Sequence, residues 1–303
     1  MSVRPVKSLS KAQPTMEGAG VHLHRAFGFS DPTMLDPFLL FDDFRGETPD
    51  AYMAGFPWHP HRGIETITYV LAGTVEHGDS LGNEGRLGAG DVQWMTAGSG
   101  IMHQEMPKGN DKGQMHGFQL WANLPSHLKM TEPRYQDVAS AEMPEIFEDD
   151  GTIVRVIIGD FWGRTGPVDG IAADPQYLDI SIPAGVKKTF PMETYRKTFA
   201  YIFEGSGSFS DASAPTGVLL EKEVAGQELN IRDLSGNRTL VEFDTGDSIT
   251  VQAGPEGIRF LLVSGAPIQE PVAWHGPIVM NTREELMTAF AELRNGKFIR
   301  SKV

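Results

Sequence analysis

Short runs of apolar and β-branched residues alternate with glycine and proline along this chain, and helical periodicity is scarce. Regularly spaced short strands separated by turn residues are typical of all-β sandwiches and barrels. The pattern therefore predicts an all-β fold with strands at residues 65–71, 92–95, 117–121, 153–158, 177–182, 199–203, 248–251 and 259–263.

One helix is expected, near the C-terminus. Thr282 suits the N-cap position, and Glu285 three residues later completes a capping box. An apolar face follows at helical spacing, formed by Leu286, Ala289, Phe290 and Leu293. Asn295-Gly296 ends the segment. We interpret it as a packing element of the C-terminal half.

The two halves of the chain share a weak internal repeat. Residues 69–74 and 201–206 each read as a strand that ends in a glycine turn, and each is followed by a Gly-Asp strand start, at Gly90-Asp91 and at Gly246-Asp247. Such self-similarity indicates two copies of one β unit. We therefore expect an N-terminal domain at residues 1–138 and a C-terminal domain at 139–303, in which the polar stretch 211–245 forms an extended hairpin or loop.

Composition narrows the chemistry. A chain of 303 residues with 40% hydrophobic residues can bury two cores of ordinary size. The absence of cysteine excludes disulfide frameworks, iron–sulfur clusters and thiol nucleophiles, so any metal site must use His, Asp or Glu. The net charge of −14 argues against a direct nucleic-acid-binding face.

No segment indicates a membrane or an export signal. Residues 1–20 lack an apolar core, and no apolar run approaches the ~18 residues that a spanning helix needs. We expect a cytoplasmic protein that does not bind membranes, or one that also enters the nucleus if its source is eukaryotic.

The nine histidines are unevenly distributed, because none lies between His127 and His275. If the chain holds two similar domains, a histidine metal site is therefore expected in the first one. Two pairs stand out, His59-x-His61 and His103-x-Glu105. Alternate residues of a strand point to the same face, so each pair can direct two ligands at one point.

Three imidazoles and one carboxylate suit Fe, Mn, Ni, Cu or Zn and leave open positions on a six-coordinate ion. Glu65 is an alternative fourth ligand, because it lies four residues after His61 and shares its parity. Pro60 and Gly63 can break strict alternation, so spacing does not decide between Glu65 and Glu105.

These motifs closely resemble those of the pirin family. The resemblance covers nearly the whole chain and is carried by residues 36–44 (DPFLLFDDF), 57–66 (PWHPHRGIET), 90–105 (GDVQWMTAGSGIMHQE), 116–125 (HGFQLWANLP) and 275–282 (HGPIVMNT). Pirins are bicupins, so the resemblance implies two cupin β-barrels packed face to face, with one divalent metal ion in the N-terminal barrel. It assigns the ligands to His59, His61, His103 and Glu105, with Fe(II) as the expected ion and Ni, Mn, Cu or Zn as alternatives.

Several pirins are similar to quercetin 2,3-dioxygenases, which open a flavonol with O₂ and release carbon monoxide. The resemblance thus implies a flavonol and O₂ as substrates, with Glu105 as the proton acceptor for the flavonol hydroxyl. We expect an apolar substrate pocket with contributions from Phe44, Trp58, Arg62, Met95 and Met102, which lie close to the ligands in sequence.

Two further functions fit the same residues. Some pirins resemble regulatory partners of transcription factors or metabolic enzymes, so a metal-containing interaction protein is one alternative. A cupin that acts on another small substrate is the other.

Overall fold

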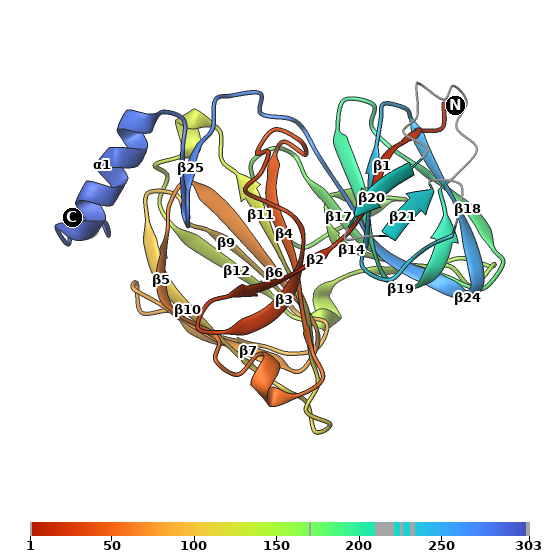
Figure 1. The fold of residues 1–303 in the computed structure, drawn as a ribbon, viewed down its shortest axis with the longest axis horizontal. Helices are drawn as coiled ribbons and strands as arrows, with labels where there is room; N and C mark the ends of the chain where they lie inside the picture. The colour runs from red at the N-terminus through yellow and green to blue at the C-terminus, as the bar shows by residue number, and fades with distance from the viewer. Residues whose placement is uncertain (1, 170, 210–220, 225–226, 231–233, 301–303) are drawn as a thin grey trace. The chain divides into compact units, whose positions relative to one another are not determined.

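The computed structural model describes residues 2–169, 171–209, 221–224, 227–230 and 234–300. The chain forms two compact units (Figure 1). The first, here called the histidine unit, comprises Pro14–Glu142 and Ile268–Val303. The other, here called the second unit, comprises Met1–Gln13 and Met143–Pro267.

These units differ from the contiguous domains expected at 1–138 and 139–303. The chain passes from the histidine unit to the second unit between residues 142 and 143, and each unit also includes a segment from the opposite end of the chain. The reason is strand pairing: β1 (Val6–Lys11) pairs with β23 (Thr239–Phe243) in the second unit. In the histidine unit, Arg62 forms a β-bridge with Ile278.

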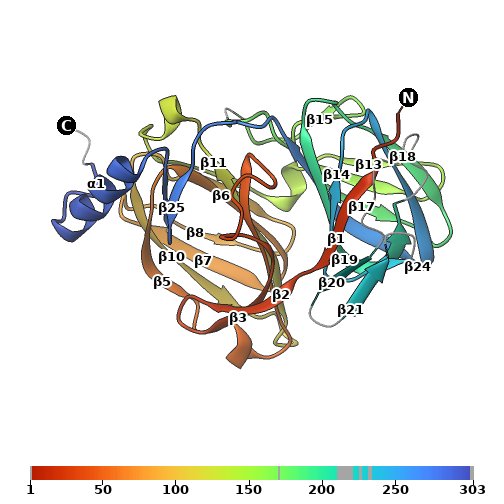
Figure 2. The same cartoon turned by 45° about the horizontal axis from the view of Figure 1, so that its top comes forward.

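The histidine unit is a barrel of two antiparallel sheets (Figure 2). The seven-stranded sheet has the order β12 (Arg134–Val138), β9 (Val92–Thr96), β6 (Ile64–Ala72), β11 (Met115–Asn123), β4 (Phe38–Gly46), β3 (Val21–Phe27) and β2 (Gln13–Glu17). The four-stranded sheet has the order β5 (Phe56–His61), β10 (Ile101–Lys108), β7 (Thr74–Asp79) and β8 (Glu84–Leu87). Short 3₁₀ turns lie at η1 (Pro49–Ala51), η2 (Ser126–Leu128) and η3 (Ser140–Glu142).

Apolar side chains fill the barrel of the histidine unit in two separate clusters. One includes Phe44, Val70 and Met115, and the other includes Leu40 and Trp121. Successive side chains on a strand point to opposite faces, so Leu40, Asp42 and Phe44 share one face of β4. A polar residue therefore lies between the two apolar clusters on this strand.

The second unit is built on one large antiparallel sheet. Its main path is β1, β23, β19 (Lys197–Ser208), β24 (Ser248–Gly265), β17 (Gln176–Ile182), β14 (Ile153–Ile158) and β13 (Glu145–Phe147), while β18 (Lys187–Pro191) pairs with β24 and β22 (Ser235–Gly236) with β19. A small ladder joins β15 (Asp160–Phe161) to β16 (Arg164–Thr165). The interior of the second unit is one continuous apolar core that includes Val156, Phe190 and Phe260.

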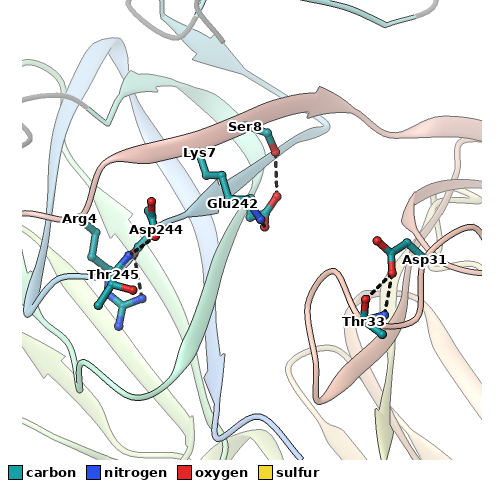
Figure 3. A network of polar contacts seen from close by, with 8 residues as sticks. All are labelled: Arg4, Lys7, Ser8, Asp31, Thr33, Glu242, Asp244 and Thr245. Carbon is teal, nitrogen blue, oxygen red and sulfur yellow. Dashed lines mark hydrogen bonds and ion pairs between the residues drawn. The ribbon is translucent and has the colours of Figure 1, made fainter. Parts of the chain in front are cut away.

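Polar contacts secure the N-terminal strand in the second unit (Figure 3). Arg4 donates from Nη1 to the carbonyl oxygen of Asp244 at 3.2 Å, and Ser8 donates to a carboxylate oxygen of Glu242 at 3.0 Å. Lys7 forms an ion pair with the same Glu242 side chain at 2.5 Å. These contacts explain why residues far apart in sequence belong to one unit.

Two expected strands, 248–251 and 259–263, are parts of the single long strand β24. Its first part pairs with β18 and its last part with β17 and β19. Within the stretch 211–245, β20 (Glu221–Val224) and β21 (Gln227–Asn230) pair antiparallel. The remaining parts of the expected hairpin at 211–220, 225–226 and 231–233 lie outside the described residues.

The expected helix is confirmed as α1 (Arg283–Arg294), with Thr282 as N-cap and the capping box to Glu285 formed. It follows a hairpin of β25 (Ala273–His275) and β26 (Ile278–Met280) and belongs to the histidine unit. The all-β architecture with two barrel domains and a C-terminal helix is also confirmed. Among the described residues, no helix is long and apolar enough to cross a membrane.

Candidate metal centre

Three histidines meet where β5 and β10 run side by side. His103 lies directly opposite His59 in this antiparallel pair, and Ile101 lies opposite His61. One nitrogen from each imidazole lies within 4.8 Å of the other two. Strand β5 is an edge strand, which is why it tolerates Pro57 and Pro60, residues that cannot donate a backbone hydrogen bond.

The hydrogen bonds of His59 and His61 fix which ring nitrogen carries a proton. His59 Nδ1 lies 2.8 Å from the carbonyl oxygen of Pro57, and His61 Nδ1 lies 3.2 Å from that of Pro277. A carbonyl oxygen only accepts, so both Nδ1 atoms donate and both Nε2 atoms hold lone pairs when the rings are neutral. The two Nε2 atoms nevertheless face each other at 3.1 Å. A cation between the two atoms, either an added proton or a metal ion, would relieve the repulsion of their lone pairs.

His103 favours the metal ion. It is buried, and neither of its ring nitrogens has a hydrogen-bond partner among the described residues. Buried polar groups without partners are costly unless something else binds them. Burial lowers the pKa of His61 and of His103 well below the ordinary imidazole value, and neighbouring imidazoles add to this effect. Both rings are therefore neutral at pH 7, as metal ligation demands.

The two candidate carboxylates lie outside the group of three histidines. Glu105 follows His103 on β10 and is buried, and it accepts hydrogen bonds from Thr68 at 3.1 Å and from Gln119 at 3.0 Å. Glu65 is also buried and accepts from the Thr96 hydroxyl at 2.7 Å. Alternation places Glu105 on the same face of β10 as His103.

A cavity of about 380 Å³ opens beside the histidines. His59 and His61 form part of its wall, and His59 is only half-buried, so the centre is accessible from this side. The rest of the lining combines apolar and polar side chains, among them Phe29, Leu40, Phe56, Trp121, Arg25 and Gln119. Asp42 also lines it, and burial raises the pKa of Asp42 to about 6 although Arg25 binds both of its carboxylate oxygens.

None of the five side chains expected to line a substrate pocket is among the residues that line this cavity. Phe44 and Met95 are core residues of the two apolar clusters, Trp58 is 51% exposed, and Met102 is half-buried. Arg62 is turned toward the C-terminal segment, where its Nη1 donates to Glu292 at 2.6 Å. Proximity in sequence does not determine which face, or which depth of the barrel, a side chain occupies.

Pro277 and Gln119 were missed by the sequence reasoning. The Pro277 carbonyl orients His61 from 216 residues away, which no local pattern reveals. Gln119 could have been found, because Gly117, Gln119 and Trp121 alternate along a strand-forming segment and thus share a face.

Comparisons with known proteins cover nearly the whole chain. The family model for pirin matches residues 20–122, and that for the pirin C-terminal cupin domain matches residues 177–299. A pirin-like protein of Caulobacter vibrioides is 42% identical over 98% of this chain and 100% of its own. Human pirin is 39% identical over 93% of this chain and 89% of its own. A solved structure of quercetin 2,3-dioxygenase from Acinetobacter baumannii matches with a TM-score of 0.84 at 29% identity, covering 98% of this chain and 99% of that one.

Proposed function

The chain belongs to the pirin family, and from this membership we propose that it is a metal-dependent dioxygenase that opens a flavonol such as quercetin with O₂ and releases CO. The proposed ligands are His59, His61, His103 and Glu105, and the proposed ion is Fe(II). The observation that carries the proposal is the pair of Nε2 lone pairs facing each other at 3.1 Å beside the buried His103 ring, whose nitrogens have no hydrogen-bond partner among the described residues. The likeness to the Acinetobacter quercetin 2,3-dioxygenase supports the choice of reaction.

A divalent ion held by such nitrogen and oxygen ligands lowers the pKa of a hydroxyl bound to it and offers open positions to small reactants. The protein supplies the rest. The proposed role of Glu105 is to accept the proton of the substrate hydroxyl; its position on the strand face that His103 also occupies supports this role. Pro277 keeps the Nε2 lone pair of His61 directed at the centre.

The cavity suits a planar aromatic molecule. Its volume of about 380 Å³ is at the small end of ordinary ligand sites. Leu40, Phe56 and Trp121 provide apolar walls, whereas Arg25 and Gln119 offer hydrogen-bond donors to oxygen substituents. The walls also limit the water that reaches the substrate once the cavity is filled.

The test measures metal content and aerobic quercetin loss with CO release for Fe, Mn, Ni, Cu and Zn forms. We expect activity that follows one metal and disappears in His59→Ala, while the exposed His22→Ala control keeps it. Glu105→Gln should retain part of the metal and lose turnover. Full activity in Glu105→Gln would refute the role of Glu105 as proton acceptor, and wild-type activity in His59→Ala would refute the centre.

A second candidate function is protein binding, favoured by a groove of about 630 Å³ along α1. Trp274, Leu286 and Phe290 form its apolar floor, and the exposed Arg283 and Arg294 contribute positive charge in a chain of net charge −14. These features complement an acidic partner segment with apolar side chains. Stoichiometric metal without turnover of quercetin would favour this role over the enzymatic one.

A further inference from the structure

A row of polar residues crosses the seven-stranded sheet of the histidine unit, one from each of six adjacent strands. Residues directly opposite each other in antiparallel strands point to the same face, so the register places this whole row on one face. We call it the polar belt; it comprises Arg25, Asp42, Gln119, Thr68, Gln93 and Asp137, in spatial order.

The polar belt lies between the two apolar clusters of the barrel. On β11 the alternation runs from Met115 in one cluster, through Gln119, to Trp121 in the other. Thr68 and Gln93 are each 2% exposed. Burying a polar side chain this deeply destabilises the fold unless hydrogen bonds replace those it made to water. The hydrogen-bond partners of the belt residues therefore indicate the role of the belt.

Gln119 and Thr68 donate hydrogen bonds to the Glu105 carboxylate. Gln119 Nε2 lies 3.2 Å from Oε1 and 3.0 Å from Oε2 of this carboxylate. The Thr68 hydroxyl donates to Oε1 at 3.1 Å. Glu105 is thus held from the opposite sheet, by two residues that are neighbours across β11 and β6.

Trp121 fixes the direction of the Gln119 amide. Its indole Nε1 donates to Gln119 Oε1 at 3.1 Å. Because an indole N–H only donates, it selects the amide orientation in which Oε1 faces the indole and Nε2 faces Glu105. The reverse orientation would set a carbonyl oxygen against the carboxylate and two donors against each other.

We propose that Gln119 is a positioning residue that holds the Glu105 carboxylate for the metal centre, with its own orientation set by Trp121. The inference rests on the proposed role of Glu105 as a ligand. The proposed role of Gln119 also connects the centre to the substrate cavity, since Gln119 and Trp121 both line that cavity. The Trp121 ring packs edge-on against the His61 ring, with 5.0 Å between the ring centroids.

The hydrogen bonds also distinguish the two oxygens of Glu105. A carboxylate offers about four lone-pair directions, two on each oxygen. Oε1 accepts from both Thr68 and Gln119, whereas among the described residues Oε2 accepts only from Gln119. Oε2 is therefore the oxygen with a free lone pair, and it is the atom that binds the ion or receives a proton.

The experiment titrates the full-length apo protein with Co(II), following affinity and the visible absorption of the bound ion. We expect Gln119→Leu to bind Co(II) ~10–100-fold more weakly, as is usual for lost partners of metal ligands, and to shift the spectrum toward that of Glu105→Ala. Gln93→Leu is the matched control, because Gln93 belongs to the same belt but donates to Asp137 at 2.9 Å. It should match the wild type in both readouts.

Trp121→Phe supplies a second, milder variant that keeps an aromatic ring and removes the indole N–H. It should change affinity and spectrum in the same direction as Gln119→Leu, by a smaller amount. Wild-type affinity and spectrum in both variants would overturn the positioning role while leaving the histidine centre intact. A wild-type spectrum in Glu105→Ala would overturn the ligand role and the inference together, and no Co(II) binding by the wild type would overturn the proposed centre itself.

Discussion

A buried lysine gives the histidine unit a stability that depends on pH. Lys129 is 2% exposed, and its Nζ donates to the carbonyl oxygen of Gly63 at 2.8 Å and to the Asn123 side chain at 2.5 Å. Neither acceptor carries a charge. Burial therefore lowers the pKa of Lys129 from 10.5 to about 7, although Glu270 and Glu285 oppose this shift.

The sign and size of the effect follow from the two pKa values. Between pH 7 and 10.5 the unfolded chain holds a proton on Lys129 that the folded chain has released. The free energy of unfolding therefore rises with pH in this window, by at most ~1.4 kcal/mol per pH unit. Below pH 7 the folded state carries the full cost of the buried charge, roughly 5 kcal/mol.

The prediction is tested by urea unfolding of the wild type and Lys129→Met at several pH values from 7 to 10. Tryptophan fluorescence reports mainly on the histidine unit, which holds Trp58, Trp94, Trp121 and Trp274 of the five tryptophans. The wild type should gain about 2.5 kcal/mol relative to the variant between pH 7.5 and 9.5. Lys108→Met, at an exposed lysine paired with Glu76, is the control and should show no such difference. Parallel curves for the wild type and Lys129→Met would refute the reasoning.

Three further predictions concern the surroundings of the centre. Gly63→Ala should prevent folding of the histidine unit or lower its free energy of unfolding, measured by thermal unfolding, by more than ~3 kcal/mol. The reason is that Gly63 has φ +76° and a Cβ there would collide with the Val279 carbonyl oxygen. The control Gly82→Ala, at φ +86° with open space around it, should lower the free energy of unfolding by only ~1–2 kcal/mol. Arg62→Met should lower the free energy of unfolding by about 3 kcal/mol, since Arg62 is 2% exposed and binds Glu292 and the Phe298 carbonyl; a loss below ~1 kcal/mol would contradict this. Glu65→Gln should leave the Co(II) spectrum unchanged whereas Glu105→Gln alters it, and the opposite result would make Glu65 the ligand.

The sequence was sufficient to predict those features that depend on a few neighbouring residues. The His59-x-His61 spacing and the capping box from Thr282 to Glu285 depend on a few consecutive residues, and the structure contains both the cluster of three histidines and the helix. The continuity of β24 was not predictable. Gly254-Pro255 is typical of a turn, yet the strand continues through it and joins the two strands expected at 248–251 and 259–263.

Features that arise from pairing between distant strands were beyond the sequence. Phe44 is on the same face of β4 as Asp42, but only the register with β11 shows that it lies two residues deeper, in the apolar cluster and away from the cavity. The contact of Pro277 with His61 likewise depends on how the C-terminal hairpin meets β5. Local alternation gives the face of a strand, whereas depth and distant neighbours come from tertiary packing.

The late position of the segment Ile268–Val303 has a consequence for biosynthesis. Domains usually begin to fold as they leave the ribosome, at ~5–20 residues per second. The histidine unit begins at Pro14, yet the acceptor for His61 is Pro277 and the partners of Arg62 are Glu292 and Phe298. The barrel that carries the three histidines therefore cannot form these contacts until the entire second unit has been translated. A protein truncated after residue 138 would for the same reason lack the contacts that Pro277, Glu292 and Phe298 make with His61 and Arg62.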